Sequence, residues 1–170
     1  MPAESAAAES AAPHGVVPLL WEAMERYFTL LQAHASAERM REEVLTDDFR
    51  TGFVGGLVWE GDQGLREFLA ARSDFFDESH TVEQMSTPEQ LPDGRVRVRT
   101  RLQFFLRQRI GKAPASDSFT GKAFHLWEFA SLPDGSWRVA AQLVEGFASL
   151  DANARRLFSQ PASGLTLDDR

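Results

Sequence analysis

Apolar residues change their spacing along the chain near residue 80. Before that point they recur at three- and four-residue steps, which puts them on one face of a helix. Three segments have this pattern: 18–35, 37–45 and 64–76. Pro18 suits a first helical turn, and Ser36 and Asp62 suit the caps of the second and third segments. We therefore predict three amphipathic helices.

The segment 50–60 interrupts the helical pattern. It carries glycines at positions 52, 55 and 56 among Phe, Val and Trp side chains. Glycine inside an apolar extended segment is typical of a bulge or of a close backbone approach. We expect a short bulged strand or an extended loop that lines a cavity.

From residue 80 onward the apolar positions alternate with polar ones, as in strands with one wet face. Four segments alternate in this way: 80–89, 95–109, 119–132 and 137–147. The tetrapeptide Leu-Pro-Asp-Gly occurs at 91–94 and again at 132–135, and its Pro and Gly suit tight turns. The pattern predicts two β-hairpins in series, followed by a short helix at 150–158.

The second strand segment, 95–109, has one apolar face and one basic face. The basic face carries Arg97, Arg99, Arg101 and Arg107. A basic row can bind nucleic acid, but the net charge of −7 argues against that partner. We favour ion pairs on an exposed sheet face or across a homodimer, in which Phe105 and Phe124 supply the apolar contact.

Helices followed by antiparallel strands predict an α+β fold. We expect a cone-shaped, curved antiparallel sheet wrapped around an N-terminal helix layer, with an apolar hollow suited to a ligand. Residues 1–16 are expected to be a disordered leader, 17–159 a single domain and 160–170 a polar tail.

The composition excludes several classes of site. With no Cys, the chain has no disulfide, thiolate metal site or cysteine nucleophile, and a reducing cytoplasm is the simplest location. No segment approaches the roughly 20 apolar residues of a membrane span. No His, Asp and Glu spacing suits a metal, and Gly55-Gly56 lacks the setting of a nucleotide loop. We expect no metal, cofactor or membrane partner.

The hairpin 119–147 carries the best chemical clue. His125 falls on an aromatic row with Phe119, Trp127 and Phe129, and the same alternation puts Glu145 on the apolar stripe of the adjacent strand. A buried carboxylate without a partner would have a raised pKa. The ordinary alternatives are a histidine bonded to backbone and a glutamate that reaches water.

Five short stretches strengthen the fold assignment by their order along the chain. They are RYFTLL at 26–31, LTDDF at 45–49, WEGDQGLREFL at 59–69, HTV at 80–82 and DGSWRVAAQLVEG at 134–146. Over 17–150 this order resembles the nuclear transport factor 2-like fold, in its SnoaL-like polyketide cyclase and ketosteroid isomerase-like branch. The resemblance implies a cystatin-like α+β barrel.

The resemblance also implies roles for single residues. Tyr27 resembles the tyrosine with which ketosteroid isomerases donate to a developing enolate, and His125 lies near the position of their protonated aspartate. Phe53 occupies the position of their catalytic base, so the isomerase route is disfavoured. Two histidines, His80 and His125, with a helix-one tyrosine resemble the scytalone dehydratase and SnoaL-like pattern.

The expected function is therefore a cofactor-independent cyclase or dehydratase of secondary metabolism that acts on a hydrophobic, polyketide-like carbonyl compound. Proton abstraction beside a carbonyl needs a base and an oxyanion donor. We expect His125, His80, Tyr27 and Glu145 to be catalytic, with a histidine base that titrates between about pH 5 and 8. The expected substrate contacts are Trp59, Arg50, Phe53, Trp127, Phe104 and Leu143.

Two other functions fit the sequence. Epoxide hydrolysis would need Arg99 or Arg101 to turn inward beside carboxylates, which the alternation opposes. A non-catalytic ligand-binding or dimerisation module would scatter the four candidate catalytic side chains. Whether these four side chains converge on one cavity separates the possibilities.

Overall fold

The computed structural model describes residues 15–111 and 116–159. The predicted polar tail, 160–170, and residues 1–14 of the predicted leader lie outside the described residues, and Val16 already belongs to the first helix. The helices are α1 (Val16–Gln32), α2 (Ala37–Glu43), α3 (Gly61–Ala71) and α4 (Ala152–Phe158).

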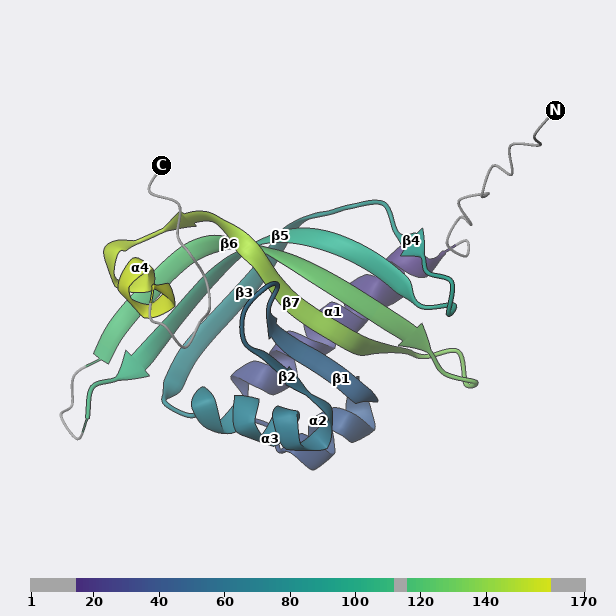
Figure 1. Ribbon diagram of the computed structural model, residues 1–170, viewed down its shortest axis with the longest axis horizontal. Coiled ribbons are helices and arrows are strands. Elements are labelled where there is room, and N and C mark those ends of the chain that lie inside the picture. Colours follow the sequence, from purple (N-terminus) through teal and green to yellow (C-terminus); the bar gives the residue numbers. More distant parts are fainter. Residues whose placement is uncertain (1–14, 112–115, 160–170) are drawn as a thin grey trace.

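A seven-stranded sheet forms the rest of the described fold (Figure 1). Its strands are β1 (Leu45–Phe53), β2 (Val58–Glu60), β3 (Phe75–Met85), β4 (Glu89–Gln90), β5 (Val96–Arg109), β6 (Ser116–Ser131) and β7 (Trp137–Leu150). The strand order is β2-β1-β7-β6-β5-β3, and β4 pairs with β5. The α+β class and the curved sheet over N-terminal helices are confirmed; the sheet is open, and its β1–β7 pair is parallel.

Both predicted Leu-Pro-Asp-Gly turns are present. Gly94 and Gly135 have φ of 87° and 85°, the left-handed region that glycine adopts without strain. In each turn the aspartate side chain accepts a backbone N–H two residues on, from Arg95 at 3.0 Å and from Ser136 at 2.9 Å. The turns therefore set the registers of the β4–β5 and β6–β7 hairpins.

The third predicted helix ends earlier than its period suggests. α3 begins at Gly61, so Asp62 lies in its first turn and is not its cap. Phe75 and Phe76 continue the helical spacing, yet they begin β3 and pair with Gln108 and Arg107 of β5. Strand pairing with the long β5 decides this boundary over the local helical period.

The strand β1 is longer than the predicted extended segment. It starts at Leu45, where the sequence pattern favoured the end of the second helix, because it pairs with β7 on one side and β2 on the other. Ser36 caps α2 as predicted, accepting the backbone N–H of Arg39 at 3.2 Å.

The core lies between the sheet and the helices. α1 crosses one face of the sheet, α2 and α3 lie near the β1–β2 edge, and α4 packs at one end of β6 and β7 (Figure 1). Tyr27, Trp127 and Phe129 are fully buried between these layers. Among the described helices, none has the length and apolar character that a membrane crossing requires.

Candidate active site

A cavity of about 330 Å³ opens between the sheet and the surrounding helices. α1, α3, the β1–β2 hairpin and α4 all contribute to its wall. Most of the lining is aromatic or aliphatic, including Phe28, Phe53, Trp59, Phe68, Phe104, Phe147 and Phe158. Phe158 of α4 stacks near Phe147, with ring centroids 4.6 Å apart, so the C-terminal helix forms one side of the wall.

Five polar side chains reach this apolar cavity. They are Thr51, Arg72, His80, His125 and Gln142. They come from β1, the end of α3, β3, β6 and β7, so elements far apart in the sequence supply one polar group each. A few polar groups in an apolar hollow are typical of small-molecule sites.

His125 is held from behind by a buried amide. The Nε2 of Gln142 lies 2.9 Å from the Nδ1 of His125, and both residues are less than a tenth exposed. The Oε1 of the same amide accepts from the Tyr27 hydroxyl at 3.2 Å and from the Thr51 hydroxyl at 3.1 Å. This chain of bonds fixes the orientation of the His125 ring at the cavity wall.

His80 is also held by an amide at its Nδ1. Its Nδ1 lies 3.1 Å from the Nε2 of Gln32, and its ring stacks on Phe28 with centroids 4.4 Å apart. The His80 ring also lines a second, outer groove of about 350 Å³ with Trp21, Glu25 and Thr29. His80 therefore faces the cavity on one side and the groove on the other.

Both imidazoles are uncharged at neutral pH. Burial lowers the pKa of His125 to about 3. Burial also lowers the pKa of His80 to about 3, with smaller contributions from His125 and from the Arg72 guanidinium. Both rings line the same cavity.

Arg72 brings a buried positive charge to the wall. Its guanidinium forms an ion pair with Glu78, donates to the Leu31 carbonyl oxygen at 3.2 Å and lies over the Phe68 and Phe75 rings. The side chain of Glu78 is fully buried, so the pair is largely neutral as seen from the cavity.

Tyr27 does not lie in the cavity wall. Its ring is fully buried and packs edge-on to Trp127, while its hydroxyl donates to Gln142. Burial raises the pKa of Tyr27, so the hydroxyl keeps its proton. The prediction that Tyr27 donates to a substrate oxygen is not supported by this placement, because the hydroxyl already donates its hydrogen bond to Gln142.

Two of the three register shifts between β6 and β7 are bulges that change which β7 side chains face the cavity. The register skips Ala140 between the pairs Phe129–Val139 and Glu128–Ala141, and it skips Glu145 between His125–Val144 and Phe124–Gly146. Each extra residue reverses the alternation that follows it. Gln142 and Val144 therefore face inward, where unbroken alternation puts Leu143 and Glu145.

The prediction that Glu145 lies on the apolar inner stripe is wrong for this reason. Its carboxylate accepts from the Nε of Arg99 at 3.1 Å on the outer sheet face, and it lines an open depression there with Phe124. Leu143 pairs with Leu126 on the same outer side and is absent from the cavity wall. Trp127 lies in the core layer, where its indole N–H donates to Thr100 at 2.9 Å.

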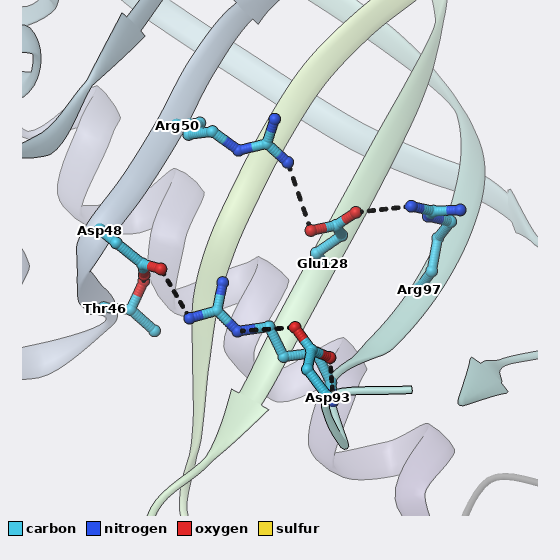
Figure 2. A network of polar contacts seen from close by, with 7 residues as sticks. Thr46, Asp48, Arg50, Asp93, Arg97 and Glu128 are labelled. Atoms are coloured by element: carbon cyan, nitrogen blue, oxygen red, sulfur yellow. Dashed lines mark hydrogen bonds and ion pairs between the residues drawn. The ribbon is translucent and has the colours of Figure 1, made fainter. Parts of the chain in front are cut away.

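Arg50 also points away from the cavity. Figure 2 shows the guanidinium groups of Arg50 and Arg97 reaching the same carboxylate, that of Glu128, at 3.3 Å and 2.8 Å. Close by, Asp48 pairs with Arg95 at 2.7 Å. Ion pairing within the chain thus accounts for Arg50, as it does for Arg101, which bonds Glu83 at 3.2 Å.

Three of the six predicted substrate contacts do reach the cavity: Phe53, Trp59 and Phe104. Four polar residues of the site were not predicted: Gln32, Thr51, Arg72 and Gln142. Two of them left a signal in the sequence. Gln142 is a lone amide in the apolar run 139–144, and Arg72 falls on the apolar face of the third predicted helix.

No group of three or more His, Asp or Glu side chains within residues 15–111 and 116–159 is arranged to hold a metal ion. Arg99 and Arg101, which epoxide hydrolysis would need inside, both form ion pairs on the outer face. The polar groups of the cavity are thus two imidazoles, one amide, one hydroxyl and one paired guanidinium.

The chain matches no protein-family model, and no curated protein is significantly similar to it. Solved structures do resemble it. A candidate scytalone dehydratase from Novosphingobium aromaticivorans is 13% identical, with a TM-score of 0.61 over 78% of this chain and 84% of that one. A ketosteroid isomerase-like protein from Erwinia carotovora is 15% identical, with a TM-score of 0.57 over 81% and 99%.

A third similar structure carries the fold name in its description. This NTF2-like protein with a cystatin-like fold, also from Novosphingobium aromaticivorans, is 17% identical. It has a TM-score of 0.51 over 84% of this chain and 88% of that one. At such identities the comparison establishes a shared fold, and function has to be argued from the site.

Proposed function

We propose that this chain, which has the cystatin-like fold of nuclear transport factor 2-like proteins, is a cofactor-independent enzyme that moves protons on a hydrophobic carbonyl compound. Dehydration, cyclisation and double-bond isomerisation all begin with this chemistry. A polyketide-like substrate of secondary metabolism fits the aromatic lining.

The observation that carries the proposal is a pair of uncharged imidazoles in one apolar cavity. Of the four side chains predicted to be catalytic, His80 and His125 line it, whereas Tyr27 and Glu145 do not, and an amide holds the Nδ1 of each histidine ring. A neutral imidazole has one protonated and one unprotonated nitrogen, so it can either donate or accept. Two such rings can supply both the base and the oxyanion donor of an enolisation.

The surroundings of the rings favour charge development during reaction. An enolate formed between two imidazoles would be poorly screened by solvent, because Phe28, Trp59, Phe104 and Phe147 surround it. Its negative charge would raise the affinity of a nearby imidazole for a proton, which offsets the low pKa of the empty site.

The lowered pKa values alter the pH dependence that the sequence suggested. An unperturbed histidine base would titrate between about pH 5 and 8. With pKa values of about 3 in the free protein, both rings stay neutral throughout that range. The catalytic efficiency, kcat/KM, should therefore be constant from about pH 5 to 8 and fall only in more acidic buffer.

The structural comparisons support the reaction class. Similar folds include a candidate scytalone dehydratase and a ketosteroid isomerase-like protein. The resemblance implies that Phe53, which lines the cavity, occupies the position of the isomerase base, so we assign the role of base to one of the two histidines.

Hydrogen exchange on a model ketone tests the proposal without knowledge of the natural substrate. β-Tetralone, a flat bicyclic ketone with acidic α-hydrogens, is incubated with the protein in D₂O, and loss of the α-hydrogen signal is followed by proton NMR. We expect catalysed exchange that falls by at least about 100-fold in His80→Asn and in His125→Asn, since general acid–base groups contribute roughly 10²–10⁴-fold.

Two control variants make the test specific. His34→Asn removes a histidine outside the cavity at a position with φ of 54°, which asparagine tolerates. Glu145→Gln alters the carboxylate that lies on the outer face. Both should exchange β-tetralone at the wild-type rate. Binding of β-tetralone without exchange would instead support a non-catalytic binding module.

A further inference from the structure

We propose that the buried Gln142 amide fixes His125 as the hydrogen-bond donor of the site, and that His80 is the ring that takes up and releases protons. The assignment rests on the proposed function, because it divides the acid–base work between the two rings of that cavity. It makes Gln142, Thr51 and Tyr27 positioning residues.

The amide of Gln142 is locked in one orientation. Its Oε1 accepts from two hydroxyl groups, those of Tyr27 and Thr51, and both residues are almost completely buried. If the amide turned over, the Thr51 hydroxyl could still donate to Tyr27, but the Tyr27 proton would lose its acceptor. An unsatisfied buried donor costs about 1–3 kcal/mol, so the observed orientation is strongly preferred.

The locked amide determines the tautomer of His125. The Nε2 of Gln142 can only donate, and its neighbour at 2.9 Å is the Nδ1 of His125. That Nδ1 must therefore be the unprotonated nitrogen of the ring. The proton of the neutral ring lies on Nε2, which has no protein partner among the described residues. His125 consequently offers the cavity an N–H group, suited to a carbonyl or enolate oxygen.

The amide that contacts His80 is not held in this way. Among the residues described, the Gln32 side chain bonds only to the Nδ1 of His80, and it lies half-buried at the outer groove. Water in that groove can hydrogen-bond to either end of the amide. The Gln32 amide can therefore turn over without leaving a buried polar group unsatisfied. His80 can therefore carry its proton on either nitrogen.

This freedom suits His80 to the role of base. With its proton on Nδ1, donated to the Gln32 oxygen, His80 has a lone pair on Nε2. A substrate C–H bond breaks, the proton forms an N–H bond at Nε2, and the electron pair becomes an enolate whose oxygen accepts from His125. The resulting imidazolium returns a proton to another substrate carbon or to a departing hydroxyl group, which leaves as water.

The outer groove gives the proton of His80 a route that His125 lacks. The His80 ring lines both the cavity and the groove, and Glu25 lies on the groove wall. His125 is 7% exposed, and it lines the cavity but not the outer groove. Exchange with solvent between turnovers should therefore be faster at His80.

Nitrogen NMR of the two rings tests the assignment directly. Long-range proton–nitrogen correlations of protein labelled with ¹⁵N-histidine distinguish protonated from unprotonated ring nitrogens, and no substrate is required. At pH 7 we expect His125 to be protonated on Nε2 alone and His80 to show an average of both tautomers. A wild-type His125 protonated on Nδ1, or a His80 fixed in one tautomer, would overturn the assignment.

Matched variants separate the two rings. Gln142→Glu replaces the donor with a carboxylate that only accepts, so Nδ1 of His125 should become protonated, while Gln32→Glu should change His80 alone. Thr51→Val removes one of the two hydroxyls that hold the Gln142 amide and should produce a second His125 tautomer. Thr51→Ser keeps a hydroxyl and should show a single tautomer. A His125 spectrum unchanged by Gln142→Glu would contradict the claim that Gln142 determines the tautomer of His125.

Kinetics separate this inference from the proposed function. In the β-tetralone assay Gln142→Glu should lower the exchange rate at least about tenfold. Gln32→Glu should instead shift the pH dependence of the exchange rate. A wild-type protein that exchanges no β-tetralone at all would count against the proposed function, while the NMR spectra would still decide the tautomer of His125.

Discussion

At the scale of single residues, the two buried histidines make stability depend on pH. Each has a pKa of about 3 in the folded chain, against about 6.5 in an unfolded one. Between these values the unfolded state binds more protons than the folded state. The free energy of unfolding therefore increases with pH through this window and falls as the solution is acidified below about pH 6.5.

Removing one ring should weaken this acid sensitivity. For His125→Gln we expect the loss of unfolding free energy between pH 7.5 and pH 5 to be smaller than in the wild type by about 2 kcal/mol, or 1.4 kcal/mol per pH unit below 6.5. Urea unfolding at the two pH values measures the difference, with His34→Asn as the control. Equal losses in wild type and His125→Gln would show that His125 is not buried in its neutral form.

Single residues were predictable where they belong to a regular pattern. His125 and Phe104 lie on strand faces whose alternation is unbroken, and both reach the cavity as expected. Glu145 and Leu143 were assigned by the same rule and lie outside, because the bulges of β7 intervene. The amide partners of the histidines were not predictable, since they come from 17 and 48 residues away along the chain.

At the scale of elements, the β1–β2 hairpin depends on one glycine. Gly52 has φ of 137°, and a Cβ atom there would lie 2.1 Å from the carbonyl oxygen of Leu57. The hairpin also carries Phe53 and Trp59 of the cavity wall. The sequence predicted an extended, bulged segment here, and the structure explains its glycine by this close approach of the two strands.

Substitution at two glycines of this hairpin should therefore have unequal effects. We expect Gly52→Ala to lower the free energy of unfolding by about 3 kcal/mol, from the backbone clash and the strained φ. Gly55→Ala, with φ of 77° and open space around a Cβ, should lower it by only about 1 kcal/mol. Urea denaturation midpoints measure both, and equal losses would argue against the close approach at Gly52.

At the scale of the whole molecule, the two faces of the sheet have separate roles. The inner face meets the helices and the cavity, whereas the outer face carries ion pairs such as Arg99–Glu145 and Lys122–Glu83. Phe124 is 40% exposed on this outer face. A large exposed aromatic ring among paired charges is consistent with the predicted homodimer contact, which stays a prediction.

The homodimer has a direct test. Sedimentation velocity of the wild type should give twice the mass of one chain, and Phe124→Glu should shift the protein towards monomer because it puts a charge into an apolar contact. Leu19→Glu is the control, since Leu19 is similarly exposed but lies on α1. A monomeric wild type, or a dimer unaffected by Phe124→Glu, would contradict dimerisation through the outer face.

The sequence by itself determined the helical and alternating segments, both Leu-Pro-Asp-Gly turns, the α+β class and the location of His125 on an apolar strand face. These features follow from local rules, because side-chain period and turn chemistry act over a few residues. Only the tertiary structure decided the parallel β1–β7 pair, the bulges that turn Gln142 inward and Glu145 outward, and the burial that keeps both imidazoles neutral. Strand partners and desolvation depend on residues far apart in the chain, so no local pattern contains them.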